Sequence, residues 1–348
     1  MTDVTASVRD GAVLVEGVPL EGGLHCETTA AGVLLGHAGL HLSEPLLFGL
    51  AGGLSFIYWD SKRQDMPFLG GRVKPFSLTR NLAARLGVTL RVQETTSATK
   101  GWDHVRTSID RGIPVGLQLD SYDLEYFTSR VHFAGHVVAM YGYDVDQAYL
   151  VDTAQQGGAV RTGLESLARA RAARGPMSAP HRTFSVELGE ASDAGDRVDA
   201  AIVPAIVDCA AEFLDPPIAN VGHRGIRTAA RRAPTWLDRL TDPRRDLPAM
   251  STMMERAGTG GALFRNLYRD FLTQCLDRLD DPAIVDTVMR GRDLVARSAE
   301  LWVTTAQLIE QAGTTLDRED LVEVGRTLDR IADVETEAMT VLSALQRG

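Results

Sequence analysis

The chain has 348 residues, of which 44% are hydrophobic and 24% are charged, and its net charge at pH 7 is −10. This composition is typical of a globular protein, and the length favours two domains. The acidic balance argues against general nucleic-acid binding. No apolar run approaches the ~18 residues of a membrane helix, and the N-terminus lacks the pattern of a signal peptide. We therefore expect neither nucleic acid nor a membrane among its partners.

Three cysteines, Cys26, Cys209 and Cys275, are widely separated along the chain. Their odd number and spacing argue against a disulfide framework and against a zinc cluster. Free cysteines are typical of a reducing compartment. We expect a cytoplasmic protein without a metal site.

The first half of the chain mixes predicted strands and helices. Alternating or continuous apolar runs predict strands at 11–20, 54–59, 88–92, 113–120, 135–143, 148–152 and 181–188. Helices are predicted from Cys26 to about 41, at 75–86 and at 102–111. The spacing of Thr162 and Glu165 is that of a capping box and predicts a further helix to Arg174.

The second half has helical periodicity only. A polar linker at 190–196 is followed by predicted helices at 198–213, 218–231, 247–257, 262–276, 282–312 and 318–345. The sequence thus predicts an α+β domain at 1–192 and an all-helical domain at 193–348.

Cys26 follows Gly22 and Gly23 and precedes an apolar segment that is rich in Ala and Leu. It is therefore expected at the N-terminus of a buried helix, where the helix dipole favours an anion. A thiolate is the nucleophilic form of cysteine. A lone cysteine is more often a core residue, so the hypothesis depends on a base elsewhere in the chain.

His136 begins a predicted strand, and Asp152 ends the next one. A hairpin turn at 144–147 brings these two positions together. A nucleophilic thiol needs such a base and an acid that orients it. His132 is a competing base, but it precedes the strand and lacks a hairpin acid. The order Cys, His, Asp is papain-like.

The segments around these residues resemble the papain-like peptidases that process bacteriocin leaders, and more closely the butirosin biosynthesis protein H family. The resemblance rests on His25-Cys26-Glu27-Thr28, on residues 43–58, on the block from Phe133 to Asp152, and on residues 258–272. It implies a papain-like domain followed by a helical extension. It also implies Cys26 as nucleophile, His136 as base and Asp152 as orienting acid.

The chain departs from papain-like enzymes at the oxyanion hole, since no Gln or Asn shortly precedes Cys26. The backbone N–H of Cys26 supplies one donor. His25, Thr28 and Gln118 are the candidates for the second.

Further candidates lie outside this core. The segment 120–126, which includes Tyr122, either lines the acceptor pocket or is a surface loop. Arg265 and Tyr268 lie in a predicted helix and are candidates for substrate contact, with Arg265 facing a partner or the cleft. A basic stretch includes Arg227, Arg231 and Arg232, which either form a solvated face or dock an acidic carrier protein.

The function implied by the resemblance is transfer of an acyl or aminoacyl group from a carrier-protein thioester to an amine, as the founding member does with an aminoglycoside. The donor is a phosphopantetheine thioester, and no bound cofactor is expected. Cyclisation within the acyl chain is a variant of this chemistry. The alternatives are a cysteine hydrolase, either a peptidase or a thioesterase, and a non-catalytic scaffold. The helical domain is expected to cover the cleft, to dock the carrier or to form a homodimer interface.

Overall fold

The computed structural model describes residues 11–62, 64–128, 131–189, 194–255 and 259–345. The chain divides into two compact units, Met1–Leu47 with Pro75–Arg197, and Phe48–Lys74 with Val198–Gly348. Residues 48–74 were predicted in the first domain, but they belong to the second unit. Of the expected linker, residues 190–193 lie outside the described part of the chain.

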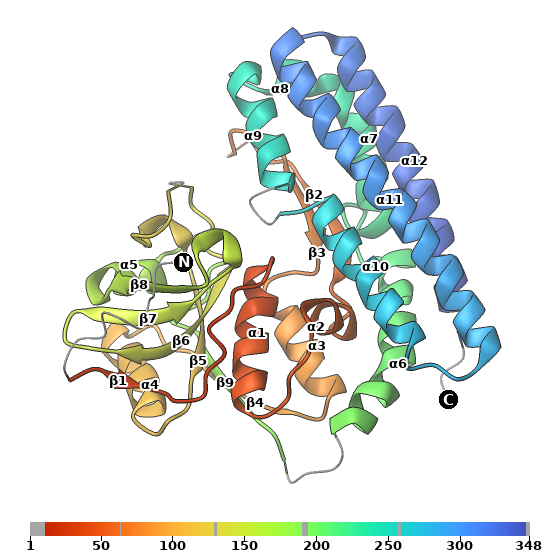
Figure 1. Ribbon diagram of the computed structural model, residues 1–348. Helices are drawn as coiled ribbons and strands as arrows, with labels where there is room; N and C mark the ends of the chain where they lie inside the picture. The colour runs from red at the N-terminus through yellow and green to blue at the C-terminus, as the bar shows by residue number, and fades with distance from the viewer. Residues whose placement is uncertain (1–10, 63, 129–130, 190–193, 256–258, 346–348) are drawn as a thin grey trace. The chain divides into compact units, whose positions relative to one another are not determined.

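The first unit is built on a seven-stranded antiparallel sheet (Figure 1). The strand order is β4-β9-β5-β6-β7-β8, and β1 pairs with β6. Its strands are β1 (Val13–Leu14), β4 (Thr89–Gln93), β5 (Val115–Leu119), β6 (His136–Tyr143), β7 (Gln147–Val151), β8 (Ala159–Gly163) and β9 (Thr183–Glu187).

Helices cover this sheet. They are α1 (Cys26–His37), α3 (Ser77–Arg85), α4 (Ala98–Ile109) and α5 (Leu164–Ala172). α1 packs against β5, β6, β7 and β9 (Figure 1). Nearly all of α1 is buried, because most of its residues are small or apolar. All of β5 is buried as well, so both faces of the sheet are covered at its centre.

The second unit consists of helices and one hairpin. The helices are α6 (Ala194–Leu214), α7 (Gly222–Arg232), α8 (Trp236–Arg239), α9 (Pro243–Glu255), α10 (Ala262–Leu276), α11 (Pro282–Thr315) and α12 (Arg318–Ser343). α11 and α12 pack side by side, and α7 packs on α12 (Figure 1). From residue 194 onward, every regular element within the described ranges is helical. The fold class is therefore α+β, as the sequence predicted.

The hairpin of β2 (Leu54–Trp59) and β3 (Phe68–Arg72) explains why residues 48–74 belong to the helical unit. Trp236 donates its indole N–H to the hydroxyl of Tyr58 at 3.2 Å. The N–H of Gly71 donates to the carbonyl of Thr259 at 2.8 Å. Contact at Gly71 is so close that a Cβ there would overlap the carbonyl oxygen of Gly260. α2 (Glu44–Leu50) spans the boundary between the two units.

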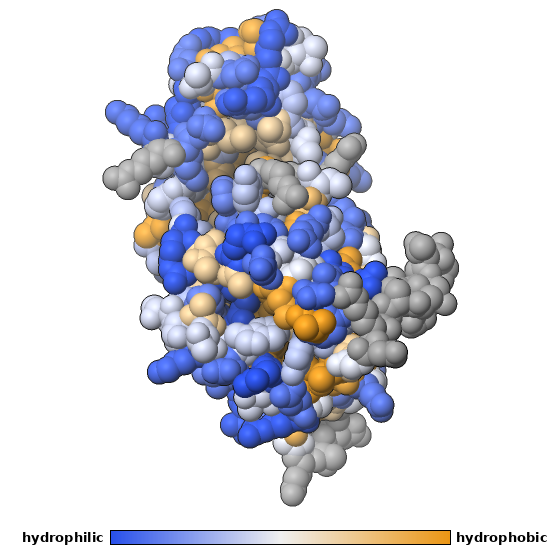
Figure 2. Space-filling view, turned by 90° about the vertical axis from the view of Figure 1, so that its left-hand side faces the viewer, coloured by the Kyte–Doolittle hydropathy of each residue, from blue (hydrophilic) through white to orange (hydrophobic). Residues whose placement is uncertain are grey.

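Large apolar residues that remain exposed, such as Leu24, Val131 and Val145, are scattered along the chain. On the face presented in Figure 2, hydrophobic patches alternate with hydrophilic side chains. Single exposed apolar residues are normal and need no special explanation.

Candidate active site

Cys26 is the first residue of α1, and it is 8% exposed. His25 precedes it in extended conformation and caps the helix, because its Nδ1 accepts the N–H of Thr28 at 3.4 Å. The first N–H groups of a helix have no intrahelical acceptor, and the dipole adds partial positive charge there. The sulfur of Cys26 therefore lies where an anion is stabilised.

Glu44, the first residue of α2, holds the turn before Cys26. Its carboxylate accepts the N–H groups of Leu24 at 2.7 Å and of His25 at 2.8 Å, and also the hydroxyl of Thr28 at 2.7 Å. Three donors on one carboxylate fix the backbone conformation of the turn. This role of Glu44 was not predicted from the sequence.

The two glycines before Cys26 pack against the residues that follow β7. The N–H of Ala154 donates to the carbonyl of Gly23 at 2.8 Å. A Cβ on Gly22 would lie 2.4 Å from the carbonyl oxygen of Asp152, so only glycine fits there. This close approach brings the Cys26 turn beside the end of β7.

His136 and Asp152 form the predicted pair. His136 begins β6, and Asp152 directly follows β7. The imidazole Nε2 lies 2.8 Å from Oδ2 of Asp152, and both residues are buried. The N–H of Thr153 donates to Oδ1 at 2.7 Å. Because Nε2 is engaged by Asp152, Nδ1 is the ring nitrogen left for Cys26.

The electrostatics favour a thiolate–imidazolium pair. Burial alone would raise the pKa of the Cys26 thiol, but the charges of His25 and His136 and hydrogen bonds from both lower this pKa well below its ordinary value. Burial would lower the pKa of His136, but the charges of Asp152 and Cys26 and the hydrogen bonds that His136 donates to both raise it to about 10. Each partner thus stabilises the charged form of the other.

Two aromatic residues contact this pair: Tyr126, which ends the segment 120–126 that was predicted to line the acceptor pocket or to form a surface loop, and Phe127. Tyr126 donates its hydroxyl to Oδ2 of Asp152 at 2.8 Å. The ring of Phe127 meets the imidazole of His136 edge to face, with centroids 5.2 Å apart. Both follow the short 3₁₀ turn η2 (Ser121–Asp123). A segment without periodicity gives no sequence signal for these contacts.

Two of the three candidates for the second oxyanion donor are engaged elsewhere. The amide nitrogen of Gln118 donates to the carbonyls of Ala134 at 3.3 Å and Met177 at 2.5 Å, which uses both of its hydrogens. The hydroxyl of Thr28 is occupied within the turn by Glu44. His25 is buried and interacts directly with Cys26, and its Nδ1 accepts from Thr28. Nδ1 also lies 3.2 Å from the hydroxyl oxygen of Thr28, and in the tautomer in which Nδ1 accepts the N–H of Thr28 the ring hydrogen is on Nε2.

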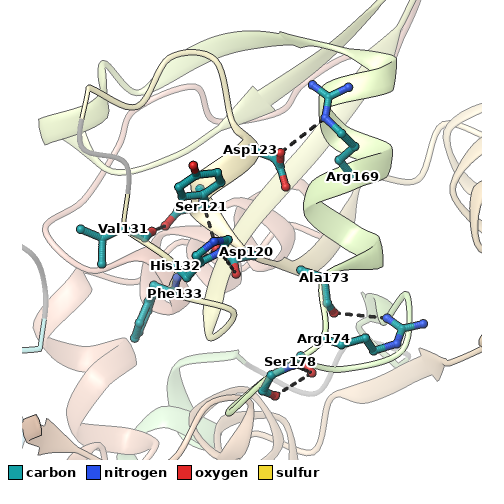
Figure 3. Close-up of polar contacts among 12 residues, drawn as sticks. Asp120, Ser121, Asp123, Val131, His132, Phe133, Arg169, Ala173, Arg174 and Ser178 are labelled. Carbon is teal, nitrogen blue, oxygen red and sulfur yellow. Dashed lines mark hydrogen bonds and ion pairs between the residues drawn. The ribbon is translucent and has the colours of Figure 1, made fainter. Parts of the chain in front are cut away.

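Tyr122 and His132 form a separate cluster at the end of β5. Asp120 accepts from Nδ1 of His132 at 3.1 Å and from the N–H of Phe133 at 2.9 Å (Figure 3). The ring of Tyr122 stacks on His132 with centroids 4.0 Å apart. The side chain of His132 is 70% exposed. His132 thus has an acid partner of its own, Asp120, which was not predicted from the sequence.

Arg265 and Tyr268, which were predicted from the sequence as candidates for substrate contact, are core residues of the helical unit. Both are fully buried. The guanidinium of Arg265 forms two bonds to Glu335, at 2.7 and 2.8 Å, and donates to the carbonyl of Gly71 at 3.2 Å. The same carboxylate accepts the indole N–H of Trp302 at 2.8 Å. The ring of Tyr268 packs near Phe271.

Of the three proposed docking arginines, Arg227 is paired within the unit. It lies 2.6 Å from Asp333 and 3.8 Å from Asp329, both on α12. Arg231 and Arg232 are exposed at the C-terminal end of α7. Arg231 donates to the hydroxyl of Thr228 at 3.0 Å.

The described ranges contain no group of three or more His, Cys, Asp or Glu side chains arranged to hold a metal ion. Cys209 and Cys275 are buried in α6 and α10. Of the helices that the structure describes, none combines the length and the hydropathy needed to cross a membrane.

Comparison with known proteins gives two family matches. Residues 25–153 match the model described as Butirosin biosynthesis protein H, N-terminal, and this range contains Cys26, His136 and Asp152. Residues 165–342 match the model described as Domain of unknown function (DUF4872). The crystal structure of a C39-like peptidase from Bacillus anthracis aligns with 53% of this chain and 100% of its own, at 16% identity and a TM-score of 0.36. No curated protein matches the chain.

Proposed function

Since the chain belongs to the butirosin biosynthesis protein H family, we propose that it is a cysteine-dependent acyltransferase of natural-product biosynthesis. It takes an acyl or aminoacyl group from a carrier-protein thioester and transfers it through Cys26 to an amine. The observation that carries the proposal is the contact of Cys26 with His136 and of His136 with Asp152, in surroundings that favour a thiolate.

In the first half-reaction the Cys26 thiolate attacks the carbonyl carbon of the thioester. The bond from that carbon to the phosphopantetheine sulfur breaks, and the imidazolium of His136 donates its Nδ1 proton to the leaving sulfur. Phosphopantetheine is part of the substrate in this scheme. Asp152 holds the other ring nitrogen and so fixes the orientation of the imidazole.

The negative oxygen of the tetrahedral intermediate needs donors, and His25 is the best supported of the three candidates. Its Nε2–H and the backbone N–H of Cys26 belong to consecutive residues at the helix start. Gln118 and Thr28 are already engaged. A thioester is an activated acyl donor, so a histidine donor in place of the usual glutamine suits it.

In the second half-reaction the amine nitrogen attacks the acyl group on Cys26. The new C–N bond forms, the C–S bond breaks, and neutral His136 takes the proton from the amine. Cys26 leaves as the thiolate, which restores the starting pair. If the amine belongs to the same acyl chain, the product is a ring.

A hydrolase is the alternative, because the same three residues can activate water. We also propose a cytoplasmic location, since Cys26, Cys209 and Cys275 are all free thiols, as is usual in a reducing compartment.

Intact-mass spectrometry tests the first half-reaction. The protein and its Cys26→Ala variant are incubated with acyl and aminoacyl thioesters of a pantetheine mimic and of a carrier protein. We expect a mass increase equal to the acyl group on the wild type and none on the variant. An increase on both proteins would place the acyl group elsewhere, and no increase with any thioester would refute the proposal.

A further inference from the structure

The carboxylate of Asp152 has a second side-chain partner besides His136. Its Oδ2 accepts Nε2–H of His136 and the hydroxyl of Tyr126, each at 2.8 Å. Its Oδ1 accepts the N–H of Thr153 at 2.7 Å. Asp152 is completely buried, so these donors replace the water that would otherwise solvate its charge.

The hydroxyl of Tyr126 comes from outside the β6–β7 hairpin that carries the other two residues. It belongs to the segment after η2, and the next residue, Phe127, lays its ring edge to face against His136 at an interplanar angle of 87°. Two consecutive side chains therefore contact the acid and the base. Packing alone would be satisfied by a phenylalanine at position 126, whereas the hydroxyl adds a directed bond to the charge.

We infer that Tyr126 is a positioning residue for catalysis, whose hydroxyl fixes Oδ2 of Asp152 and limits how tightly Asp152 holds the Nε2 proton of His136. The inference rests on the proposed nucleophilic role of Cys26. Its physical basis is that Tyr126 and His136 donate to the same oxygen, Oδ2 of Asp152. The hydrogen bond from Tyr126 disperses the negative charge on this oxygen, which attracts the imidazolium of His136.

The groups that act on His136 are few. Asp152 and Cys26 face its two ring nitrogens, Tyr126 acts through Asp152, and His25 acts on Cys26. Burial and the negative charge of Asp152 raise the pKa of Tyr126 well above its ordinary value. Tyr126 therefore remains a donor across the range in which His136 titrates, and its removal should raise the pKa of His136.

Tyr126→Phe removes the hydroxyl and keeps the ring. Tyr122→Phe is the matched control, because Tyr122 lies in the same segment and its ring stacks on His132. The readout is the ratio of the rates at which iodoacetate and iodoacetamide alkylate Cys26, measured against pH. The anionic reagent is favoured only while His136 is positive, so the ratio falls where His136 loses its proton, at about 10 in the wild type.

We expect this fall at higher pH in Tyr126→Phe and at an unchanged pH in Tyr122→Phe. At neutral pH we expect thioester acylation of Tyr126→Phe to be roughly tenfold slower than that of the wild type. The loss of one hydrogen bond to a charged group has an effect of about this size. The ¹⁵N-resolved Nε2–H resonance of His136 should move in Tyr126→Phe alone, and it is measured at neutral pH, where alkaline unfolding plays no part.

An unchanged midpoint and an unchanged Nε2–H resonance in a folded Tyr126→Phe protein would overturn the inference. Neither alkylation nor the resonance requires a thioester. A failure of the proposed acyl transfer would therefore be seen separately. In that case the alkylation midpoint and the Nε2–H resonance would still shift in Tyr126→Phe, but the wild type would never acquire an acyl group.

Discussion

At the residue scale, the candidate site depends on charges that stabilise one another in a buried setting. The Cys26 thiolate and the His136 imidazolium would each be unfavourable alone, because burial penalises both charged forms. Asp152 adds a second negative charge on the far side of the imidazole. Loss of Asp152 would therefore remove part of what stabilises the charged form of His136.

Replacement of Asp152 should alter the pH dependence of Cys26 alkylation. In the wild type the pKa of Cys26 lies well below its ordinary value, so iodoacetamide should react rapidly near neutral pH. In Asp152→Asn the pKa of His136 should fall, because the charge of Asp152 is the main cause that raises it. The rise in alkylation rate should then move to higher pH. Alkylation of Cys26 is followed by peptide mapping. A rate that rises at the same pH in Asp152→Asn as in the wild type would contradict this role of Asp152.

His25 is expected to act in the transition state. In His25→Asn the side chain still caps α1, since Asn is a good N-cap, but the Nε2–H donor is lost. We expect single-turnover acylation to fall about 100-fold, the usual effect of one lost oxyanion donor. The exposed His41→Asn serves as a control and should retain the wild-type rate. A His25→Asn enzyme as fast as the control would exclude His25 as the donor.

At the scale of elements, the sequence predicted the helices and strands whose runs of apolar residues indicate burial directly. The apolar α1, the run of β-branched and aromatic residues in β6, and the α10 helix at 262–276 were all predicted, the last with the bounds Ala262–Leu276. The hairpin that joins His136 to Asp152 also followed from two apolar runs and the turn between them.

Elements that depend on tertiary contacts were missed. The strand β8 was not predicted, and Thr162 lies in it, so the expected capping box is absent. α5 instead begins at Leu164, with Gly163 as its N-cap and no side-chain cap. β3 (Phe68–Arg72) is short and rich in glycine, and it pairs because the helical unit packs against it.

The same limit applies to the site. Cys26, His136 and Asp152 stand at predicted element ends, whereas Glu44 and Tyr126 act from positions with no local pattern. Arg265 was expected to face a partner or the cleft, and no local pattern reports its pairing with Glu335, which is 70 residues away in the sequence.

Glu27 illustrates an element held by a distant side chain. It is fully buried, and its carboxylate accepts the N–H of Phe76 at 3.1 Å and the N–H and hydroxyl of Thr79 at 3.0 and 2.9 Å. Phe76, the N-cap of α3, has φ 69° and no capping side chain of its own. Glu27 therefore caps α3 from α1.

Glu27→Gln should lower the free energy of unfolding by about 1–3 kcal/mol, since buried donors lose a charged acceptor. The exposed Glu165→Gln, in the first turn of α5, should change it by no more than about 0.5 kcal/mol. Urea unfolding measures both. Equal losses in the two variants would rule out the capping role.

At the scale of the whole molecule, the second unit is stabilised by a buried polar network centred on Glu335. Arg265→Met alone leaves this carboxylate without its cation and should cost about 3–5 kcal/mol. Arg265→Met with Glu335→Leu removes both charges and should be more stable than Arg265→Met, as measured by urea unfolding. A double variant less stable than the single one would contradict this.

Carrier docking is proposed for Arg231 and Arg232 on the helical unit. Both arginines are exposed, unlike Arg227, which is paired with α12. Reversal to Glu at both positions should weaken binding of an acidic carrier protein and leave acylation by a free pantetheine thioester unchanged. Equal binding of the carrier protein by the variant and the wild type, measured by calorimetry at low salt, would exclude this surface.

A homodimer formed by the long helices is also proposed, and light scattering tests it.

The most direct test of the central claim is the fate of the preformed acyl-enzyme. Cys26 is loaded with a thioester, excess donor is removed, and discharge is followed by mass spectrometry over a range of amine concentrations. The account predicts that discharge accelerates with amine concentration and yields the amide. Discharge to the free acid at a rate independent of amine would contradict it and would identify the protein as a hydrolase.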